Sequence, residues 1–197
     1  SGLGSGTVKV GIHIAAPALG LAPGSPVDKM ARQRLSTVYM PGHKITLLPE
    51  EWINSYSLQA GQNCPSLSLY LWVDENNFAL QKSQTRVECV PIAANLRLEQ
   101  LQDPRLLAFL QNPLSPALET STNTASWYPW SSALHFLHRL ACHWKKGREA
   151  VRGKPEVLNR PDYSFKLDKP EDQVPKGEET VHIGLRERGS PIDLIVS

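Results

Sequence analysis

The sequence predicts an α+β fold in which a mixed, largely antiparallel sheet is flanked by helices, and three observations support this class. Several segments alternate apolar and polar residues with period two, which is typical of strands. Residues 131–151 instead carry apolar side chains at helical spacing. The two kinds of element interleave without the regular βαβ order of a parallel sheet. A chain of 197 residues, 41% of them hydrophobic, is long enough to bury a core.

The predicted strands are defined by alternation and by the turns between them. In residues 7–14, the side chains of Val8, Val10 and Ile12 fall on one face and polar residues on the other. The residues ENN at 75–77 separate two alternating segments, which predicts an antiparallel hairpin. Strands are expected at residues 7–14, 37–40, 66–74, 78–90, 163–167 and 180–185.

The predicted helices begin at sequence signals for N-caps. Ser25 is suited to the N-cap, Pro26 to the first helical position, and Asp28 adds a carboxylate to the first turn. Ser190 and Pro191 repeat the same start. Helices are expected at residues 26–34, 49–56, 95–110 and 131–151 and from Pro191 onward, and a flexible loop rich in Pro, Ser and Thr is expected at 112–129.

Composition excludes several broad classes of protein. The 21 Lys and Arg residues against 19 Asp and Glu leave a net charge of +2, which excludes a histone-like basic chain. No apolar run reaches the roughly 18 residues that a membrane span needs. Residues 1–6 show no signal-peptide pattern, so we expect a cytoplasmic protein with no membrane partner. Cys64, Cys89 and Cys142 form no CxxC motif, which argues against a disulfide framework or a zinc ribbon.

The residues alone give little evidence for a hydrolytic centre. Adjacent acids such as Glu50 and Glu51 lie at helix starts or in turns, where solvated carboxylates are the norm, and no stretch spaces carboxylates closely enough for a metal pair. His138 and Cys142 share a helix face at positions i and i+4, which is a possible zinc geometry. We favour a structural role for this pair, because no remote second ligand pair accompanies it.

A basic run follows the apolar part of the long predicted helix. Between residues 139 and 154, six basic residues stand against one acid, Glu149, which gives a local net charge of +5. Such a run is typical of a surface that binds phosphates, but also of a helix end whose cations complement the helix dipole. Both interpretations stay open, and Lys145, Lys146 and Arg148 are the candidate phosphate-binding residues.

Four segments near the start of the chain have the order and spacing of a known family. They are VGIHIA (10–15), GSPVD (24–28), ARQRLSTVYMPG (31–42) and ITLLP (45–49). Together they closely resemble the ribonuclease II (RNB) catalytic domain, which has a VHIAD-like strand, a GS-x-LD-x-x-A-x-x-R helix, a VYLP segment and an IPMLP turn. RPDY at 160–163 and SPIDLIV at 190–196 are similar to later blocks of that domain. The resemblance therefore spans residues 1–197.

The resemblance implies a processive 3′→5′ exoribonuclease, which hydrolyses single-stranded RNA to nucleoside 5′-monophosphates with two Mg²⁺ ions. In that family the metal ligands are aspartates in a D-x-x-x-x-x-D-x-D-D pattern just before the VHIAD-like strand. This chain contains no such pattern, so we expect no catalytic and no metal-binding residue within it. We expect the chain to be the central part of an RNB domain from a longer bacterial protein with flanking OB-fold domains, and to be inactive alone.

The resemblance also implies roles for single residues in RNA binding. Tyr39 matches the family's tyrosine that clamps the 3′-terminal base, and stacking suits an exonuclease because every base has a π-face. Arg34 matches the family's helix arginine, which could contact a phosphate or simply support the fold.

Three positions depart from the family pattern. Ala16 replaces the acid of the VHIAD motif, Val157 aligns with a second base-clamping aromatic residue, and Leu98 aligns with a tyrosine that reads the ribose. These departures predict weaker base clamping and less discrimination between RNA and DNA. They also leave open a degenerate RNB domain that binds RNA or a protein without cutting. A third interpretation is an interaction domain with no nucleic-acid role.

Overall fold

A computed structural model describes residues 2–113, 125–156, 162–168, 177–186 and 189–196. The strands are β1 (Thr7–Ala15), β2 (Val38–Met40), β3 (His43–Ile45), β4 (Asn63–Asp74), β5 (Leu80–Pro91), β6 (Asp162–Leu167) and β7 (Val181–Arg186). The α-helices are α1 (Pro26–Arg34), α2 (Glu50–Ser55), α3 (Leu98–Leu101), α4 (Pro104–Gln111), α5 (Ser131–Arg152) and α6 (Pro191–Val196). Two short 3₁₀ helices are η1 (Pro17–Gly20) and η3 (Tyr128–Trp130).

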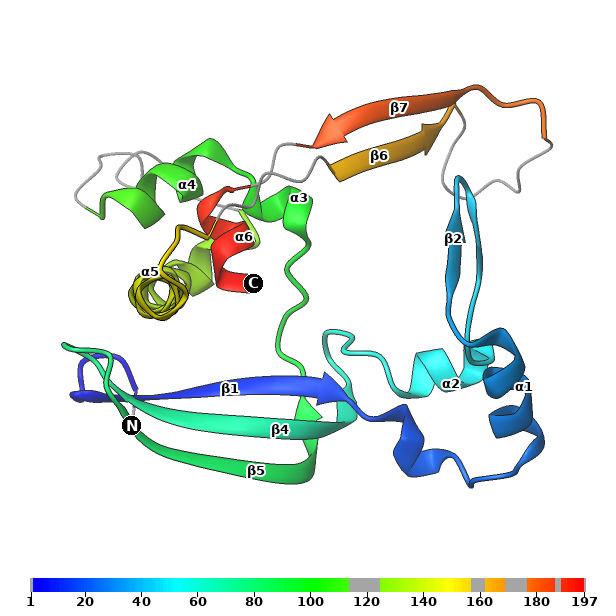
Figure 1. Ribbon diagram of the computed structural model, residues 1–197, viewed down its shortest axis with the longest axis horizontal. Coiled ribbons are helices and arrows are strands. Elements are labelled where there is room, and N and C mark those ends of the chain that lie inside the picture. Colours follow the sequence, from blue (N-terminus) through cyan, green and yellow to red (C-terminus); the bar gives the residue numbers. More distant parts are fainter. Residues whose placement is uncertain (1, 114–124, 157–161, 169–176, 187–188, 197) are drawn as a thin grey trace.

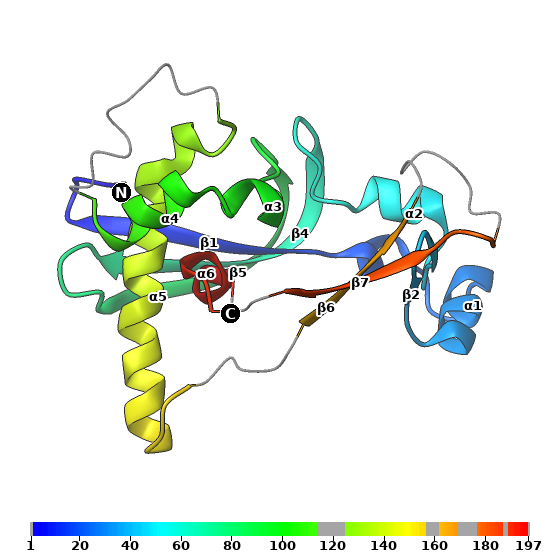
Figure 2. The ribbon, with the colours of Figure 1, turned by 90° about the horizontal axis from the view of Figure 1, so that it is seen from above.

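The predicted α+β class is confirmed, and the strands form three antiparallel sheets. A three-stranded sheet has the order β1-β4-β5, and β2-β3 and β6-β7 are separate two-stranded hairpins. Within the described ranges every strand pairing is antiparallel. Figure 1 shows α4, α5 and α6 gathered over one end of the three-stranded sheet, with α1, α2 and β2 beyond its other end. In Figures 1 and 2, the β6-β7 hairpin runs from the α6 region toward β2.

Helix α5 connects two apolar clusters that form the core. Towards the sheet, Phe136 and Leu140 pack with Val8, Leu71 and Val73. On its other side α5 contributes to a cluster between helices, whose buried members are Leu101, Leu106, Leu110, Trp127, Leu134 and Ile192. The alternation that predicted β1 and β4 thus places their apolar residues under α5, because successive strand residues point to opposite faces.

Two helices begin with the same capping geometry, as their shared Ser-Pro-x-Asp sequence predicts. The backbone N–H of Asp28 donates to Ser25 Oγ (3.2 Å), and Asp28 Oδ2 accepts from Gly24 N (2.8 Å). At α6, the N–H of Asp193 donates to Ser190 Oγ (3.2 Å), and Asp193 Oδ2 accepts from Ser190 N (3.0 Å). In each case one side chain satisfies a backbone donor that the first helical turn leaves unpaired.

The single helix predicted at residues 95–110 is wrong: the structure has α3 and α4, separated at Asp103 and Pro104. Proline has no backbone N–H to continue the helix, and it disfavours the helical conformation of the residue before it. Asp103 accordingly has extended dihedral angles (φ −60°, ψ 123°) and caps α4 by accepting a hydrogen bond from the N–H of Arg105 (2.9 Å).

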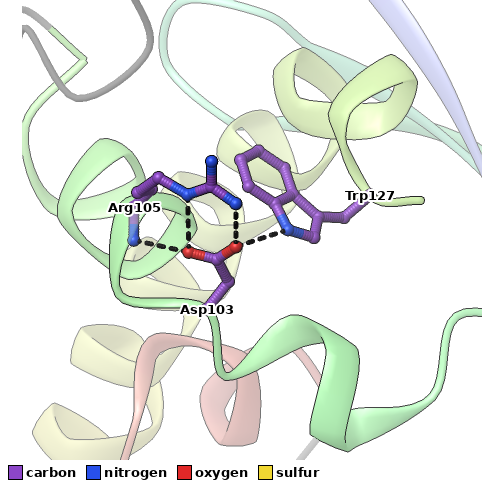
Figure 3. A network of polar contacts seen from close by, with 3 residues as sticks. All are labelled: Asp103, Arg105 and Trp127. Atoms are coloured by element: carbon purple, nitrogen blue, oxygen red, sulfur yellow. Dashed lines mark hydrogen bonds and ion pairs between the residues drawn. The ribbon is translucent and has the colours of Figure 1, made fainter. Parts of the chain in front are cut away.

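The Asp103 carboxylate also ties α4 to the core (Figure 3). It accepts two hydrogen bonds from the Arg105 guanidinium, Nη2 to Oδ2 (2.7 Å) and Nε to Oδ1 (3.1 Å). The buried indole of Trp127 donates from Nε1 to Asp103 Oδ2 (3.3 Å). The hydrogen bonds from Arg105, opposed by burial, lower the pKa of Asp103 to about 2. The sequence predicts a flexible loop at residues 112–129. Within it, Trp127 is buried and Tyr128 begins η3, so this end of the predicted loop is packed on the core, and residues 114–124 lie outside the described ranges.

Candidate functional site

The β2-β3 hairpin presents Tyr39 to solvent. Tyr39 pairs with Lys44 across the hairpin, and 79% of its surface is exposed. The turn is made by Pro41 and Gly42, whose φ of +69° is a conformation that glycine adopts at no steric cost. Sequence analysis predicted the strand at 37–40 but not its partner β3. A large aromatic ring held in the open on a two-stranded hairpin is suited to stacking on a flat ligand.

Arg34 supports the base of this hairpin. Its Nη1 donates to the backbone carbonyl of Thr46 at 2.6 Å, just after β3. Thr37, just before β2, accepts a hydrogen bond at its hydroxyl from the N–H of Leu47 (3.1 Å). Both contacts join the two ends of the hairpin, so Arg34 holds the segment that carries Tyr39. A contact between Arg34 and RNA stays a prediction.

Leu35, which ends α1, is exposed in an unfavourable backbone conformation. Its φ is +62°, its ψ is −32°, and 82% of its surface faces solvent. A side chain at positive φ costs on the order of 1 kcal/mol and is usually found where surrounding contacts or function require it. Leu35, Val38, Met40 and Ile45 are also exposed apolar residues, and strand alternation places Val38, Met40 and Ile45 on the face of the hairpin opposite Tyr39. The face that carries Tyr39 therefore combines an aromatic ring with the exposed cation Lys44.

Ion pairs engage three of the six basic residues of the predicted run. Arg148 Nη2 lies 3.0 Å from Glu156 Oε2, and Arg152 Nη1 lies 3.7 Å from Glu156 Oε1. Lys145 Nζ lies 3.8 Å from Glu149 Oε1. Within the described residues Lys146 makes no ion pair. The sequence did not reveal this arrangement, because Glu156 lies beyond the end of α5 and folds back onto it.

Lys146 lines a cationic pocket of about 480 Å³ on α5, together with Arg139, His135, His138 and His143. Among the described residues, the lining of this pocket includes no carboxylate. Burial, followed by the charges of Arg139 and His138, lowers the pKa of His135, so His135 is neutral near pH 7. The fixed positive charge of the pocket therefore comes from Arg139 and Lys146, and it is suited to an anion such as a phosphate.

The His138–Cys142 pair, considered as a zinc site, forms a local contact on this helix. His138 Nδ1 lies 3.0 Å from the carbonyl oxygen of Leu110, so Nδ1 carries the proton, and Nε2 faces Cys142 Sγ at 3.5 Å. In the part of the chain that the structure describes, no three His, Cys, Asp or Glu side chains come together as a metal site. The described acids therefore do not fit a pair of Mg²⁺ ions.

The predicted site residues do not converge. In both ribbon views α5 lies near one end of the molecule, and α1 with the β2-β3 hairpin lies near the other (Figures 1 and 2). Tyr39 and Arg34 thus belong to one surface, and Lys145, Lys146 and Arg148 to another.

Of the three departures from the family pattern, Leu98 and Ala16 lie within the described residues. Leu98 packs against the helical core. Ala16 joins the end of β1 to β4, because its backbone N–H donates to the carbonyl oxygen of Pro65 (3.0 Å). Val157 lies outside the described residues.

Comparisons with known proteins show which fold this chain shares and to which family it belongs. The fold is similar to that of Mycoplasma genitalium RNase R in complex with double-stranded RNA, with a TM-score of 0.69, 17% identity, and coverage of 95% of this chain and 29% of that one. It is also similar to yeast Ssd1, described as a pseudonuclease, with a TM-score of 0.55, 23% identity, and coverage of 80% and 17%. These likenesses show a fold shared by exoribonucleases and a pseudonuclease. The sequence-family model of the RNB domain matches residues 2–188 of this chain, so the chain belongs to the RNB domain family.

Curated relatives agree with this assignment. Exoribonuclease 2 of Vibrio parahaemolyticus is 27% identical over 185 residues, which cover 92% of this chain and 25% of the relative. Protein SSD1 of Saccharomyces cerevisiae is 30% identical over 100 residues, which cover 51% of this chain and 8% of the relative. The chain thus spans a quarter or less of the length of these relatives. The relatives include bacterial and eukaryotic proteins.

No helix within the described ranges is long and apolar enough to cross a membrane.

Proposed function

We propose that the protein to which this chain belongs is a 3′→5′ exoribonuclease that hydrolyses single-stranded RNA to nucleoside 5′-monophosphates. Membership of the RNB family and similarity to exoribonucleases support this reaction class. The observation that carries the proposal is Tyr39, exposed at 79% in the VYMPG hairpin where the family places a base-stacking tyrosine. The chain would supply one wall of the RNA path, and Mg²⁺ held by residues outside it would supply the chemistry of water activation.

Each proposed contact follows from the chemistry of the surface. The Tyr39 ring stacks on the terminal base, a contact worth about 1–3 kcal/mol. Arg34 acts through the hairpin that it holds, and its guanidinium N–H groups other than the one bound to Thr46 can donate to a phosphate. On α5, Lys146 and Arg139 bind the phosphate backbone, whereas Arg148 and Lys145 must first leave their acidic partners.

We further propose flanking OB-fold domains and a bacterial cytoplasmic setting. The free cysteines Cys64, Cys89 and Cys142 agree with a reducing compartment.

The test uses the full-length protein and a 5′-labelled single-stranded RNA. In Mg²⁺ we expect stepwise shortening from the 3′ end with release of nucleoside 5′-monophosphates, and EDTA should stop it. The Tyr39→Ala variant should lose about 10-fold or more in trimming rate at limiting RNA, because it lacks the stacking contact. Lys29→Ala, an exposed change on α1, is the matched control. RNA that binds the full-length protein but stays intact in Mg²⁺ would contradict the nuclease.

A second candidate function is a degenerate RNB domain that binds RNA or a protein without cutting. Ala16 at the acid position of the VHIAD motif favours it, as does the similarity to yeast Ssd1, described as a pseudonuclease. The same assay separates the two candidates, because the binding module retains RNA in Mg²⁺ without shortening it.

If the full-length protein is an exonuclease, the departures at Val157 and Leu98 predict weak selectivity for RNA over DNA. Matched RNA and DNA oligonucleotides should then be trimmed at similar rates.

A further inference from the structure

The face of the three-stranded sheet opposite α5 carries a cluster of aromatic and basic side chains. Because side chains alternate along a strand, Val8, Leu71 and Val73 point toward α5, and their neighbours point to the other face. We call this the outer sheet face and define it by Lys9 on β1, Tyr70 and Trp72 on β4, and Lys82 and Arg86 on β5. No function described above uses these residues.

The five side chains form one continuous network across three strands. Lys9 Nζ lies 3.6 Å from the centroid of the Tyr70 ring and 5.3 Å from that of Trp72. Lys82 Nζ lies 4.8 Å from the Trp72 centroid, and Arg86 Cζ lies 5.6 Å from the Tyr70 centroid. The two ring centroids are 6.3 Å apart, at an interplanar angle of 52°. Each ring is thus flanked by cations from both neighbouring strands.

A side chain at Gly11, beneath Tyr70, would crowd the rings of Tyr70 and His13. Gly11 pairs with Tyr70 across the β1-β4 ladder, and a Cβ at Gly11 would lie 3.1 Å from Tyr70 Cε1 and 2.6 Å from His13 Nε2. His13 in turn contacts the Tyr70 ring edge-on, with centroids 5.5 Å apart. The ring of Tyr70 therefore lies over Gly11 and against the ring of His13.

The charges of the outer sheet face favour an anionic ligand. Lys9, Lys82 and Arg86 are exposed cations, and the described carboxylates on the same face are Glu88 and Asp74. Hydrogen bonds from the hydroxyls of Tyr70 and Ser68 lower the pKa of Glu88, so it is ionised. Asp74 Oδ1 accepts hydrogen bonds from the N–H groups of Asn76 and Asn77 (2.9 and 3.1 Å) at the turn between β4 and β5. Three cations against two carboxylates leave a net positive charge around the two rings.

We propose that the outer sheet face binds single-stranded RNA outside the path that contains Tyr39. Bases stack on Tyr70 and Trp72, while Lys9, Lys82 and Arg86 move from the rings to the flanking phosphates. Flat rings beside cations are the features with which proteins bind single strands irrespective of sequence. The start of β1, where Lys9 lies opposite Trp72, is at the end of the sheet remote from β2 in Figure 1. The choice of RNA rests on the proposed function, but the site does not involve Tyr39.

The test measures binding of the full-length protein, in EDTA so that no RNA is trimmed, to a fluorescent 12-nucleotide RNA by anisotropy, using linear RNA and a circular RNA that has no 3′ end. The double variant Tyr70→Leu/Trp72→Leu should bind both RNAs at least about 10-fold more weakly. Tyr163→Leu/Phe165→Leu, which removes two exposed rings at the same i, i+2 spacing on β6, is the matched control and should bind like the wild type.

A second variant keeps both rings and tests the cations. Lys9→Glu/Lys82→Glu/Arg86→Glu should also weaken binding, and it should reduce the slope of log K against log salt concentration by about 0.7 for each phosphate that is no longer neutralised. The control Lys29→Glu/Lys166→Glu changes charge elsewhere on the surface. Wild-type affinity in both outer-face variants, or equally weakened binding in their controls, would overturn the proposal and leave the face to a protein partner.

The two proposals can fail separately. Tyr39→Ala should weaken binding of linear RNA with a free 3′ end and leave binding of circular RNA unchanged. The outer-face variants should weaken both. A full-length protein that never trims RNA, but whose outer-face variants no longer bind circular RNA, would remove the nuclease and keep this site.

Discussion

Asp103 connects three parts of the helical core through one carboxylate. It caps α4, binds the Arg105 guanidinium and accepts the indole N–H of Trp127. A helix cap at Asp103 is predictable from the Asp-Pro sequence, just as the caps at Ser25 and Ser190 are predictable from their Ser-Pro sequences. Its bond to Trp127 is not predictable, because 24 residues separate the two partners along the chain and only the packed fold brings them together.

The charge of Asp103 should make stability depend on pH. Its pKa is lowered from 3.8 to about 2 in the folded chain, so folding favours the ionised form. The contribution is complete at pH values above the unfolded pKa and is lost as the pH falls from near 4 through 2. Asp103→Asn keeps an acceptor for Trp127 but no charge. Urea unfolding at several pH values should show a smaller fall in stability for this variant than for the wild type; parallel curves would contradict it.

Leu35 gives a second prediction for a single residue. Its side chain is 82% exposed at a φ of +62°, so Leu35→Gly removes strain and little buried surface. We expect a free energy of unfolding equal to or up to about 1 kcal/mol above that of the wild type, since the extra freedom of glycine offsets part of the relief. RNA binding should weaken if Leu35 flanks the Tyr39 contact. Lower stability with unchanged RNA binding would show instead that Leu35 packs in the fold.

Most helices and strands follow from local sequence signals. The alternation in residues 7–14, the Ser-Pro-x-Asp caps and the helical spacing of 131–151 all correspond to observed elements. The apolar spacing of residues 95–110 obscures the signal at Pro104, although proline is sufficient to break the helix. The short strand β3 could not be predicted, because its residues HKI do not alternate clearly and it forms only through pairing with β2.

Helix α5 should be the element on which the core depends most, because it contributes to both apolar clusters. Leu140 is 2% exposed and packs with Val8, Leu71 and Val73 under the sheet. Leu140→Ala should lower the free energy of unfolding by about 2–5 kcal/mol. Val151→Ala, at a residue 90% exposed on the same helix, is the control and should change it little. Thermal or urea unfolding measures both, and equal effects would contradict the assignment of the core.

At the scale of the whole molecule, the separation of the two predicted surfaces matters most. The resemblance to the RNB family singles out Tyr39 because the VYMPG motif is local, and the structure exposes this residue on a hairpin. The basic run is visible in composition, but the ion pairs of Arg148 and Arg152 with Glu156 depend on how the chain folds beyond α5. The residues of the outer sheet face come together only through the register of three strands. The sequence contains these residues but does not show that they form one surface.

The most direct test of the account asks what the Tyr39 hairpin contacts. The chain is irradiated with a single-stranded RNA that carries 4-thiouridine at its 3′ terminus, and the crosslinked peptide is identified by mass spectrometry. The account predicts a crosslink within residues 38–45 that disappears when the 4-thiouridine is moved to the 5′ end. Crosslinks that avoid this hairpin with the 3′ label, or that are the same for both labels, would contradict the assignment of Tyr39 to the end of the RNA strand.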